Sequence, residues 1–387
     1  MSEQVLPTRK SKAGWRAEKQ AEAEKRLYFA SQWQLIWWRF RRNKVALVSG
    51  LVVAIIYFIT IFAEFLAPYS SEFYNGRYTF APPQALHFLI RTDDGIRFQP
   101  HVYGFDLKVD PNSFKRTLVP NPDKIVPVHV FAKGEPYRLF GLIPTDVHLL
   151  QPEKPRDPMY LFGADRLGRD VLSRTIHGTR VSMSIGLIGV TLSLVLGVIL
   201  GGISGFFGGG IDTFIQRVIE FLQSIPTIPL WMGLAAAIPQ SWTPLQVYLA
   251  ITVILSLIGW TALARQVRGK FMAIKYEDFV TAARLDGLSE LTIIRKHLVP
   301  SFFSHIVASV TLAIPTMILA ETSLSFIGIG LKPPVVSWGV LLQEAQNIQS
   351  VATAPWLFLP GVAIVVAVLS MNFLGDGLID AADPYGN

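Results

Sequence analysis

Six long apolar runs constrain this chain more than any other feature of its sequence. Each run is long enough to form a helix across a bilayer, which needs roughly 20 consecutive apolar residues. The composition agrees, since 51% of the residues are hydrophobic and only 16% are charged. We therefore expect an all-α polytopic membrane protein with six transmembrane helices, over residues 45–66, 181–207, 213–238, 245–264, 306–329 and 356–375.

The first apolar run and the cysteine content bear on how the chain is processed. Residues 1–44 are polar and basic, and the run 45–66 is too long for the h-region of a secretory signal peptide. We predict that this run stays in the protein as a membrane anchor. Cysteine is absent, so there is neither a disulfide framework nor a cysteine-based metal site.

The basic residues are concentrated in two segments. Residues 1–44 contain eleven Lys or Arg residues, and the segment 265–300 contains seven more. The short connections 239–244 and 330–355 contain only one basic residue, Lys332. By the positive-inside rule, the N-terminal tail 1–44, the loop 265–300 and the C-terminal tail 376–387 lie in the cytoplasm. The net charge of +7 is thus explained by membrane topology rather than by binding to nucleic acid.

Residues 67–170 interrupt the apolar pattern, and they follow the first predicted helix, so we place them outside the cytoplasm. Several short segments have strand-like composition, and the pairs Asp94-Gly95 and Lys133-Gly134 are typical of hairpin turns. We expect a small, mostly β extracytoplasmic insert with strands at His87–Ile90, Val126–Phe131 and Tyr137–Leu142. A partly ordered loop is the alternative, because prolines are frequent and the periodicity is weak.

Glycines and prolines within the predicted helices bear on their packing. Gly197 and Gly201 form a small-x-x-x-small pair, which lets two helix backbones approach closely. Pro226 and Pro229 fall in the third run and Pro315 in the fifth. Such residues break membrane helices where neighbouring helices or a water-filled path satisfy the freed carbonyls. We therefore expect broken helices within a five-helix core, residues 171–375.

A series of short motifs resembles permeases of ABC importers, in the peptide/nickel branch that includes dipeptide and oligopeptide transporters. The motifs occur in order between the apolar runs and cover more than half of the chain. They include Phe-Gly-Ala-Asp-Arg-Leu-Gly-Arg-Asp (162–170), Gly-Phe-Phe-Gly-Gly-Gly-Ile-Asp (205–212), Glu-Thr-Ser-Leu-Ser-Phe-Ile-Gly-Ile-Gly (321–330) and Asn-Phe-Leu-Gly-Asp-Gly-Leu-Ile-Asp-Ala-Ala-Asp-Pro (372–384). The resemblance implies the six-helix fold of type I importer permeases.

Residues 276–300 resemble the cytoplasmic coupling loop of these permeases. The family pattern is Glu-Ala-Ala, three residues, Gly, nine residues, Ile, one residue, Leu, Pro. Matching residues are Ala282, Ala283, Gly287 and Pro300, and departures are Thr281, His297 and Val299. The resemblance implies that the loop transmits ATP-driven motion through Glu277, Phe279, Thr281, Ala282, Ala283, Leu285, Gly287 and Pro300. An ordinary cytoplasmic linker is the alternative.

The residues of this loop suit such a contact. Gly287 can end a helix in the left-handed conformation, which side chains with a Cβ disfavour. Ala282 and Ala283 have little bulk, so the helix before Gly287 can enter a groove on another protein. Phe279 and Leu285 would be its apolar anchors.

The chain contains no ATP-binding motif. Gly269-Lys270 lacks the upstream glycine and is followed by Phe271, whereas a P-loop requires Gly-x-x-x-x-Gly-Lys-Ser/Thr. We therefore expect no cofactor in this chain, with ATP and magnesium bound by partner subunits. The resemblance implies two ABC ATPase subunits, a second homologous permease and an extracytoplasmic substrate-binding protein, all at a bacterial inner membrane.

The function implied by the resemblance is peptide import by alternating access, without enzymatic chemistry in this chain. Relatives in the same branch carry oligosaccharides, opine-like conjugates or nickel chelates, so these remain alternative ligands. An ion-coupled secondary transporter is the alternative from another class. Such a carrier needs ionisable residues within its helices, and the apolar runs offer few.

Glu321 is the ionisable residue that most needs an explanation, because charged groups inside a membrane are costly. With Ser323 and Ser325 it either lines the translocation path or makes a helix–helix contact. Arg217 and Glu220 are spaced i and i+3, so we expect them to pair with each other.

Other polar residues are predicted to have structural roles. Arg169, Asp170 and Arg174 suggest a short amphipathic helix before the second apolar run. Asp376 and Asp380 share a helix face and are expected to pair with basic residues of the coupling loop. The histidines lack metal-ligand spacing, and we expect no metal site at His87, His101, His129 or His148.

Overall fold

The computed structural model describes residues 32–382, except Asp93, Asp94, Asp110, Asn112, Ser113, Lys115, Pro155 and Phe302. Residues 1–31 of the predicted N-terminal tail and residues 383–387 of the predicted C-terminal tail lie outside the described part. Asp94 of the first predicted turn also lies outside it.

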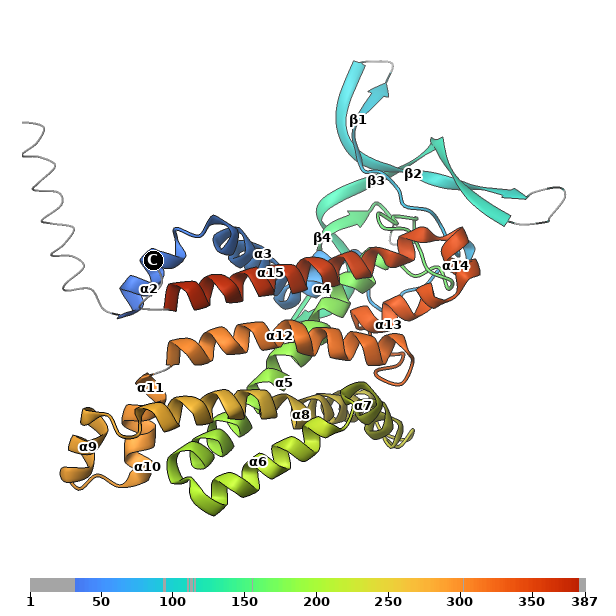
Figure 1. Ribbon diagram of the computed structural model, residues 1–387. Coiled ribbons are helices and arrows are strands. Elements are labelled where there is room, and N and C mark those ends of the chain that lie inside the picture. The colour runs from blue at the N-terminus through green and yellow to red at the C-terminus, as the bar shows by residue number, and fades with distance from the viewer. Residues whose placement is uncertain are drawn as a thin grey trace, which may run out of the picture.

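Long apolar helices are the main elements of the described structure. Five of them have the length and composition to cross a membrane: α3 (Lys44–Ile61), α5 (Val171–Phe207), α8 (Pro244–Ile274), α12 (Phe303–Phe326) and α15 (Leu359–Ala382). Figure 1 shows α8, α12 and α15 side by side, with α5 crossing them obliquely. α5 packs mainly against α8, while α15 packs against both α12 and α3.

The third apolar run is a bent pair of helices. α6 (Gly209–Ser224) and α7 (Thr227–Ala236) meet at 85°, with Ile225 and Pro226 between them. Proline lacks the backbone N–H and pushes the preceding residue out of the helical region, which ends α6 here. The predicted break is confirmed, and the pair makes a sixth candidate span. The break expected at Pro315 is wrong, because α12 continues through that residue.

Three helices extend beyond the apolar runs that predicted them. α5 begins at Val171, α8 ends at Ile274 and α15 ends at Ala382. Apolar windows detect the part of a helix that lies in lipid, but polar residues can prolong it. The separate amphipathic helix expected around Arg169 is therefore wrong. Asp170 instead caps α5, its carboxylate accepting the backbone N–H of Ser173 at 2.7 Å.

The shorter helical elements precede or connect these spans. They are α2 (Gln32–Phe40), α4 (Ala63–Leu66), η1 (Gly76–Tyr78), α9 (Asp278–Leu285), α10 (Glu290–Ile293), η2 (Ile294–Leu298), α11 (Val299–Ser301), α13 (Trp338–Gln343), η3 (Glu344–Gln346), α14 (Ile348–Thr353) and η4 (Pro355–Phe358).

The insert after the first span contains a four-stranded antiparallel sheet in the order β1-β2-β3-β4, which confirms a small, mostly β subdomain. Its strands are β1 (His87–Thr92), β2 (Gly95–Val109), β3 (Arg116–Leu139) and β4 (Ile143–Pro152). The turn expected at Lys133-Gly134 is wrong. β3 runs through these residues with a register shift between Lys133 and Tyr137, and the chain reverses near Gly141 instead.

Buried polar groups attach the sheet to the helices. Both ring nitrogens of His148 on β4 lie 2.9 Å from carbonyl oxygens, those of Ala67 and Glu135. The N–H of Tyr69 donates to the hydroxyl of Ser173 at 3.0 Å, at the start of α5. We call the bundle end next to the sheet the sheet end, and the end that holds residues 265–300 the loop end. The two lie at opposite ends of α8 and α12 in Figure 1.

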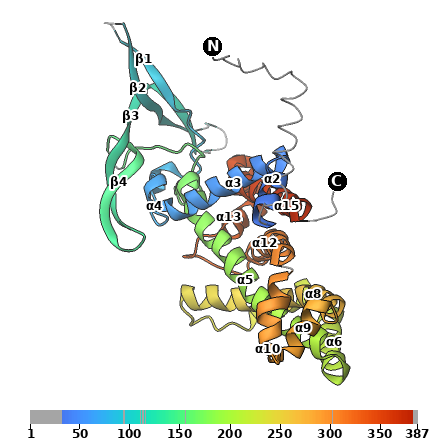
Figure 2. The same ribbon diagram turned by 90° about the vertical axis from the view of Figure 1, so that its left-hand side faces the viewer.

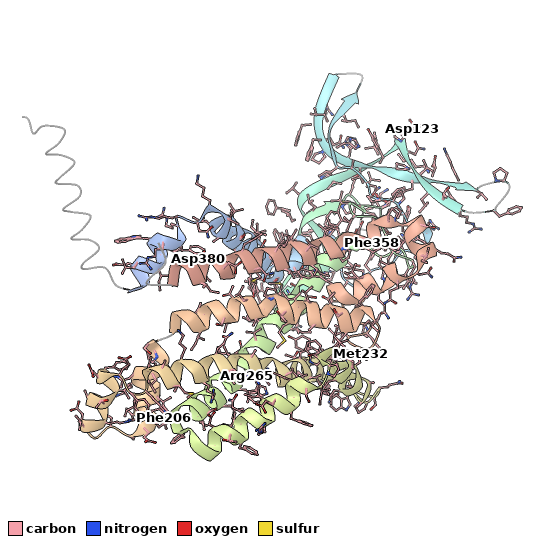
Figure 3. The ribbon with its side chains drawn as sticks, viewed as in Figure 1. Asp123, Phe206, Met232, Arg265, Phe358 and Asp380 are labelled. Carbon is pink, nitrogen blue, oxygen red and sulfur yellow. The ribbon has the colours of Figure 1, made fainter. Side chains whose placement is uncertain are left out.

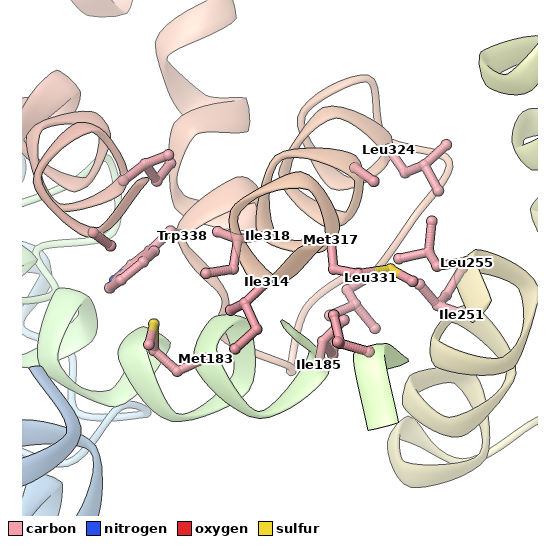
Figure 4. Packing of buried hydrophobic residues seen from close by; sticks show 14 of the residues in the cluster. Met183, Ile185, Ile251, Leu255, Ile314, Met317, Ile318, Leu324, Leu331 and Trp338 are labelled. Atoms are coloured by element: carbon pink, nitrogen blue, oxygen red, sulfur yellow. The ribbon is translucent and has the colours of Figure 1, made fainter. Parts of the chain in front are cut away.

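The main apolar core lies where α5, α8, α12 and α15 meet. Figure 4 shows Met317 and Ile318 of α12 between Met183 of α5 and Leu255 of α8. Trp338 at the start of α13 is also fully buried in this cluster. The side chains of four separate helices thus hold the bundle together.

Glycines permit direct backbone contact between α5 and α8. A Cβ placed on Gly201 would lie 2.4 Å from the carbonyl oxygen of Ala264, and one on Gly205 would lie 2.6 Å from that of Arg268. No side chain fits in either position. The close approach expected from Gly197 and Gly201 is therefore present.

We predict that Gly201→Ala lowers stability by about 1–3 kcal/mol, because the added methyl group must separate the two helices. The measurement is the temperature at which the detergent-solubilised protein loses its monodisperse elution. Gly233→Ala in α7 is the matched control, since a Cβ there meets no atom within 4 Å. Equal transition temperatures for the two variants would contradict the proposed backbone contact.

Candidate functional site

The loop 265–300 folds into a compact helical unit rather than an extended linker. Its first ten residues complete α8, and α9 follows after a short turn. Gly287 has a φ of +75° and ends α9, with its N–H donating to the carbonyl of Arg284 at 3.0 Å. The N–H of Leu288 reaches back to the carbonyl of Ala283 at 3.2 Å. The expected helix and its glycine cap are therefore present.

One face of α9 packs against the rest of the chain. Val280 and Ala283 are buried in a cluster with Phe206 at the end of α5, Phe271 of α8 and Leu298 of η2. Figure 3 shows Phe206 next to α9 and α10. The expectation that Ala283 meets a partner groove is thus wrong. Its small side chain lets α9 approach its own bundle instead.

The opposite face of α9 is exposed and partly apolar. Leu285 is 85% exposed and Phe279 is 42% exposed, with no partner in the described chain that would cover them. The exposed small residues Thr281 and Ala282 lie between them in the sequence. We call this surface the α9 outer face, and it comprises Phe279, Thr281, Ala282 and Leu285. Glu277, before the helix, and Pro300, in α11, are also exposed.

A charged pair connects the helices next to this loop. Both carboxylate oxygens of Asp212 in α6 accept from the guanidinium of Arg268 in α8, each at 2.6 Å. Asp212 also accepts from the hydroxyl of Ser204 in α5. Three helices are therefore joined at the loop end by one carboxylate. No local sequence pattern indicates this pair, because 56 residues separate its members.

Asp376 and Asp380 form no ion pair with the loop 265–300 among the residues that the structure describes. The last turns of α15 pack against α2 instead, where Ala381 and Phe40 share a small apolar cluster. The expected pairing is therefore wrong, since α15 reaches the loop end on the other side of α12 from α9 (Figure 1).

Glu321 lies fully buried in α12 and holds a network of three serine hydroxyls. Its Oε1 accepts from Ser325 at 2.8 Å and from Ser337 at 2.7 Å, and its Oε2 accepts from Ser182 of α5 at 3.2 Å. Ser323 is exposed and bonds to the carbonyl of Leu319, so it does not belong to this network.

Each of these serines also accepts a backbone N–H. Ser325 accepts that of Leu331 at 3.0 Å and Ser182 accepts that of Trp338 at 3.1 Å. Ser337 caps α13 by accepting the N–H of Val340 at 3.2 Å. Glu321 therefore orients the hydroxyls that fix the connection between α12 and α13 against α5. This geometry favours the helix–helix role over a path-lining role.

Only part of this network is predictable from local sequence patterns. Ser337 precedes a helix and is a typical N-cap residue. Ser182 lies 139 residues from Glu321, and no local pattern indicates the contact.

Arg217 and Glu220 pair as expected, with Arg217 donating to the Glu220 carboxylate at 2.7 Å on an exposed face of α6. Within the described part of the chain, no group of three or more His, Asp or Glu side chains is arranged to hold a metal ion.

A second polar cluster, formed by Asp165, Arg169 and Glu344, lies at the sheet end. Arg169 donates to Asp165 at 2.6 Å and to Glu344 of η3 at 2.8 Å, which ties the segment before α5 to the segment after α13. Burial raises the pKa of Glu344 and raises that of Asp170 to about 7. The ordinary pKa of Asp170 is 3.8, so between about pH 4 and pH 7 the folded state keeps a proton on Asp170 that the unfolded chain loses. The free energy of unfolding therefore decreases as the pH rises through this range.

A cavity of about 460 Å³ opens at the sheet end. The turn between α7 and α8 lines one side of it and the connection between α12 and α13 lines the other. Lys332, Pro333 and Pro334 lie on that connection, which the Glu321 network holds in place.

The Glu321 network yields a direct test. Glu321→Gln should keep assembly and most transport, because the amide can still accept one hydroxyl and donate to another. Glu321→Leu leaves three buried hydroxyls without their acceptor, each such contact being worth about 0.6 kcal/mol on average in membrane bundles. We expect the Leu variant to assemble poorly, as measured by its yield in size-exclusion chromatography. A Gln variant that assembles fully yet transports nothing would contradict the structural role.

Comparisons with known proteins find two matching families and a distantly similar solved structure. Residues 194–385 match the family described as binding-protein-dependent transport system inner membrane component, and residues 31–83 match the N-terminal TM domain of oligopeptide transport permease C. An inward-facing structure of the MetNI methionine ABC transporter has a TM-score of 0.45 and 19% sequence identity, covering 55% of this chain and 97% of that chain.

Curated relatives extend over most of the chain. The dipeptide transport system permease protein of Lactococcus lactis subsp. cremoris (strain MG1363) is 34% identical over 357 residues, which cover 92% of this chain and 91% of the relative. The dipeptide transport system permease protein of Bacillus subtilis (strain 168) is 36% identical, over 61% of this chain and 72% of the relative. These matches confirm the resemblance and the fold class predicted from the motifs. The chain belongs to the binding-protein-dependent transport permeases of the inner membrane, the membrane-spanning subunits of ABC importers.

Proposed function

We propose that this permease subunit carries peptides across a bacterial inner membrane and that two separate ATPase subunits drive it through the α9 outer face. Within this proposal the chain itself binds no ATP and catalyses no reaction. A second, homologous permease completes the pathway, and a substrate-binding protein delivers the peptide at the sheet end.

The main support for this proposal is the exposed, partly apolar α9 outer face. Exposed apolar side chains on a short helix at the end of a bundle are typical of a contact with another protein. Phe279 and Leu285 provide apolar anchors, and the small Ala282 between them leaves space for a groove to close around the helix. A helix seated in a groove by such anchors is a common mode of recognition.

The buried face of α9 supports transmission of motion into the membrane. Val280 and Ala283 pack on residues at the ends of α5 and α8, and the guanidinium of Arg284 lies 5.4 Å from the ring centre of Phe206. A displacement of α9 therefore has to move the ends of both helices. ATP binding and hydrolysis in the partners would thus switch the permease between inward-open and outward-open states.

The relatives' names favour peptides as the cargo. Both relatives above are dipeptide permeases, and an oligopeptide permease of Bacillus subtilis (strain 168) is 34% identical over 62% of this chain. They give no support to oligosaccharides, opine-like conjugates or nickel chelates. An ion-coupled carrier is disfavoured as well. The buried Glu321 carboxylate, which could bind a coupling ion, already accepts hydrogen bonds from three serine hydroxyls.

We predict that Ala282→Arg disrupts the contact with the ATPase subunits without unfolding the permease, because residue 282 is exposed. A charged, bulky side chain within an apolar groove should cost about 2 kcal/mol or more, roughly a 30-fold loss in affinity. The measurements are co-purification of the ATPase subunits and ligand-stimulated ATP hydrolysis in the assembled complex.

The matched control is Ala352→Arg, which makes the same change at an exposed helical alanine of α14 at the sheet end. This control should retain its ATPase subunits. Normal ATPase association in the Ala282→Arg variant would show that coupling depends on another surface.

We further propose that the loop end faces the cytoplasm, as the distribution of basic residues predicts. The chain contains no cysteine, so single cysteines report topology directly. In intact cells whose outer membrane is permeabilised, Thr117→Cys on β3 should react with a membrane-impermeant maleimide, whereas Ser289→Cys should react only after lysis. Both positions are exposed. Labelling of Ser289→Cys before lysis would reverse the assignment.

A further inference from the structure

The turn between β3 and β4 is apolar and exposed. It reads Leu-Phe-Gly-Leu-Ile-Pro over residues 139–144 and contains no charged residue. Leu142 is 80% exposed, Ile143 is 56% exposed and Phe140 is 51% exposed. A cluster of large apolar side chains at the tip of a hairpin is unfavourable in water, which makes this turn a candidate contact surface.

The turn lies next to the first membrane span. The ring of Phe140 packs edge-on against that of Phe62, the residue directly after α3, with 5.6 Å between ring centres. Phe131 on β3 stacks on Phe65 of α4 at 6.0 Å. β3 and β4 both contact α4, and Figure 2 shows the end of this hairpin beside α4. The turn is therefore held at the level where α3 ends.

The exposed side of α3 continues into this surface. Phe58 and Ile61, in the last turn of α3, are about half exposed, and in a membrane-spanning helix such side chains face lipid. The apolar band of α3 thus runs without interruption onto the hairpin turn through Phe62 and Phe140. The surface is continuous with the face that contacts the bilayer.

The backbone and the nearest charges are compatible with entry into lipid. The N–H groups of Gly141 and Leu142 donate to the carbonyls of Arg138 and Leu139 at 3.0 and 3.1 Å, so the turn presents few unpaired donors. Arg138 is exposed, and its long side chain can extend to the headgroups.

We propose that the β3–β4 turn inserts into the leaflet at the sheet end of the membrane, with Phe140, Leu142 and Ile143 at the boundary between headgroups and acyl chains. The hairpin then anchors the sheet against the bilayer beside α3. The occupant of this surface is lipid, and the proposal depends only on α3 being a membrane span.

The cysteine-free chain allows a direct test. Leu142→Cys is labelled with an environment-sensitive fluorophore, and the full-length protein is reconstituted into phosphatidylcholine nanodiscs that carry doxyl-labelled lipids. Because Leu142 is so exposed, the substitution removes little internal packing. Phe58→Cys serves as the lipid-facing control and Thr117→Cys, far along β3 from the turn, as the water-facing control.

We expect a doxyl group near the headgroup to quench the label at residue 142 more strongly than a doxyl group near the chain end. Its emission should also be blue-shifted towards that of the Phe58 label. A label at residue 142 that matches the Thr117 label in both quenching and emission would overturn the proposal. Emission that shifts only when the substrate-binding protein is added would show that the turn contacts that protein instead of lipid.

Discussion

The bundle depends on direct backbone contact between α5 and α8. Gly201 and Gly205 bring α5 against the carbonyls of Ala264 and Arg268, where no side chain would fit. Within a bilayer the surrounding lipid is as apolar as the helices, so close van der Waals packing has to replace the hydrophobic effect. Since α8 continues from this contact to Ile274, it also sets the position of the 265–300 loop.

Two carboxylates join α5 to other helices on either side of this contact. At the loop end Asp212 joins α5, α6 and α8 through Ser204 and Arg268, next to the cluster that holds α9. Towards the sheet end Glu321 joins α5, α12 and the start of α13. Glu321 is fully buried and Asp212 is part-buried. Removing a carboxylate from water is costly unless its oxygens are hydrogen-bonded, so each one favours the arrangement of helices that supplies its partners. Under the proposed coupling through α9, helices joined in this way would move as a unit.

The candidate site could be predicted from local patterns only where its residues are close in sequence. The glycine cap of α9 and the pair Arg217–Glu220 follow from spacings of a few residues, and the structure contains both. The partners of Glu321 are different, because Ser182 comes from another helix. The orientation of α9 also depends on tertiary contacts, which is why Ala283 was expected at a partner and is instead buried.

The sequence by itself determined the apolar spans and the family, because lipid requires long apolar runs and because the motifs are local. It favoured a β insert without deciding it. Tertiary structure decided where polar helices end, since Val171 and Ala382 lie beyond the apolar runs. It also decided that Pro315 stays within a helix and that Lys133 stays within a strand. Breaker residues only raise the local cost of a regular element, and packing against α5 and α15 or pairing with β4 can offset that cost.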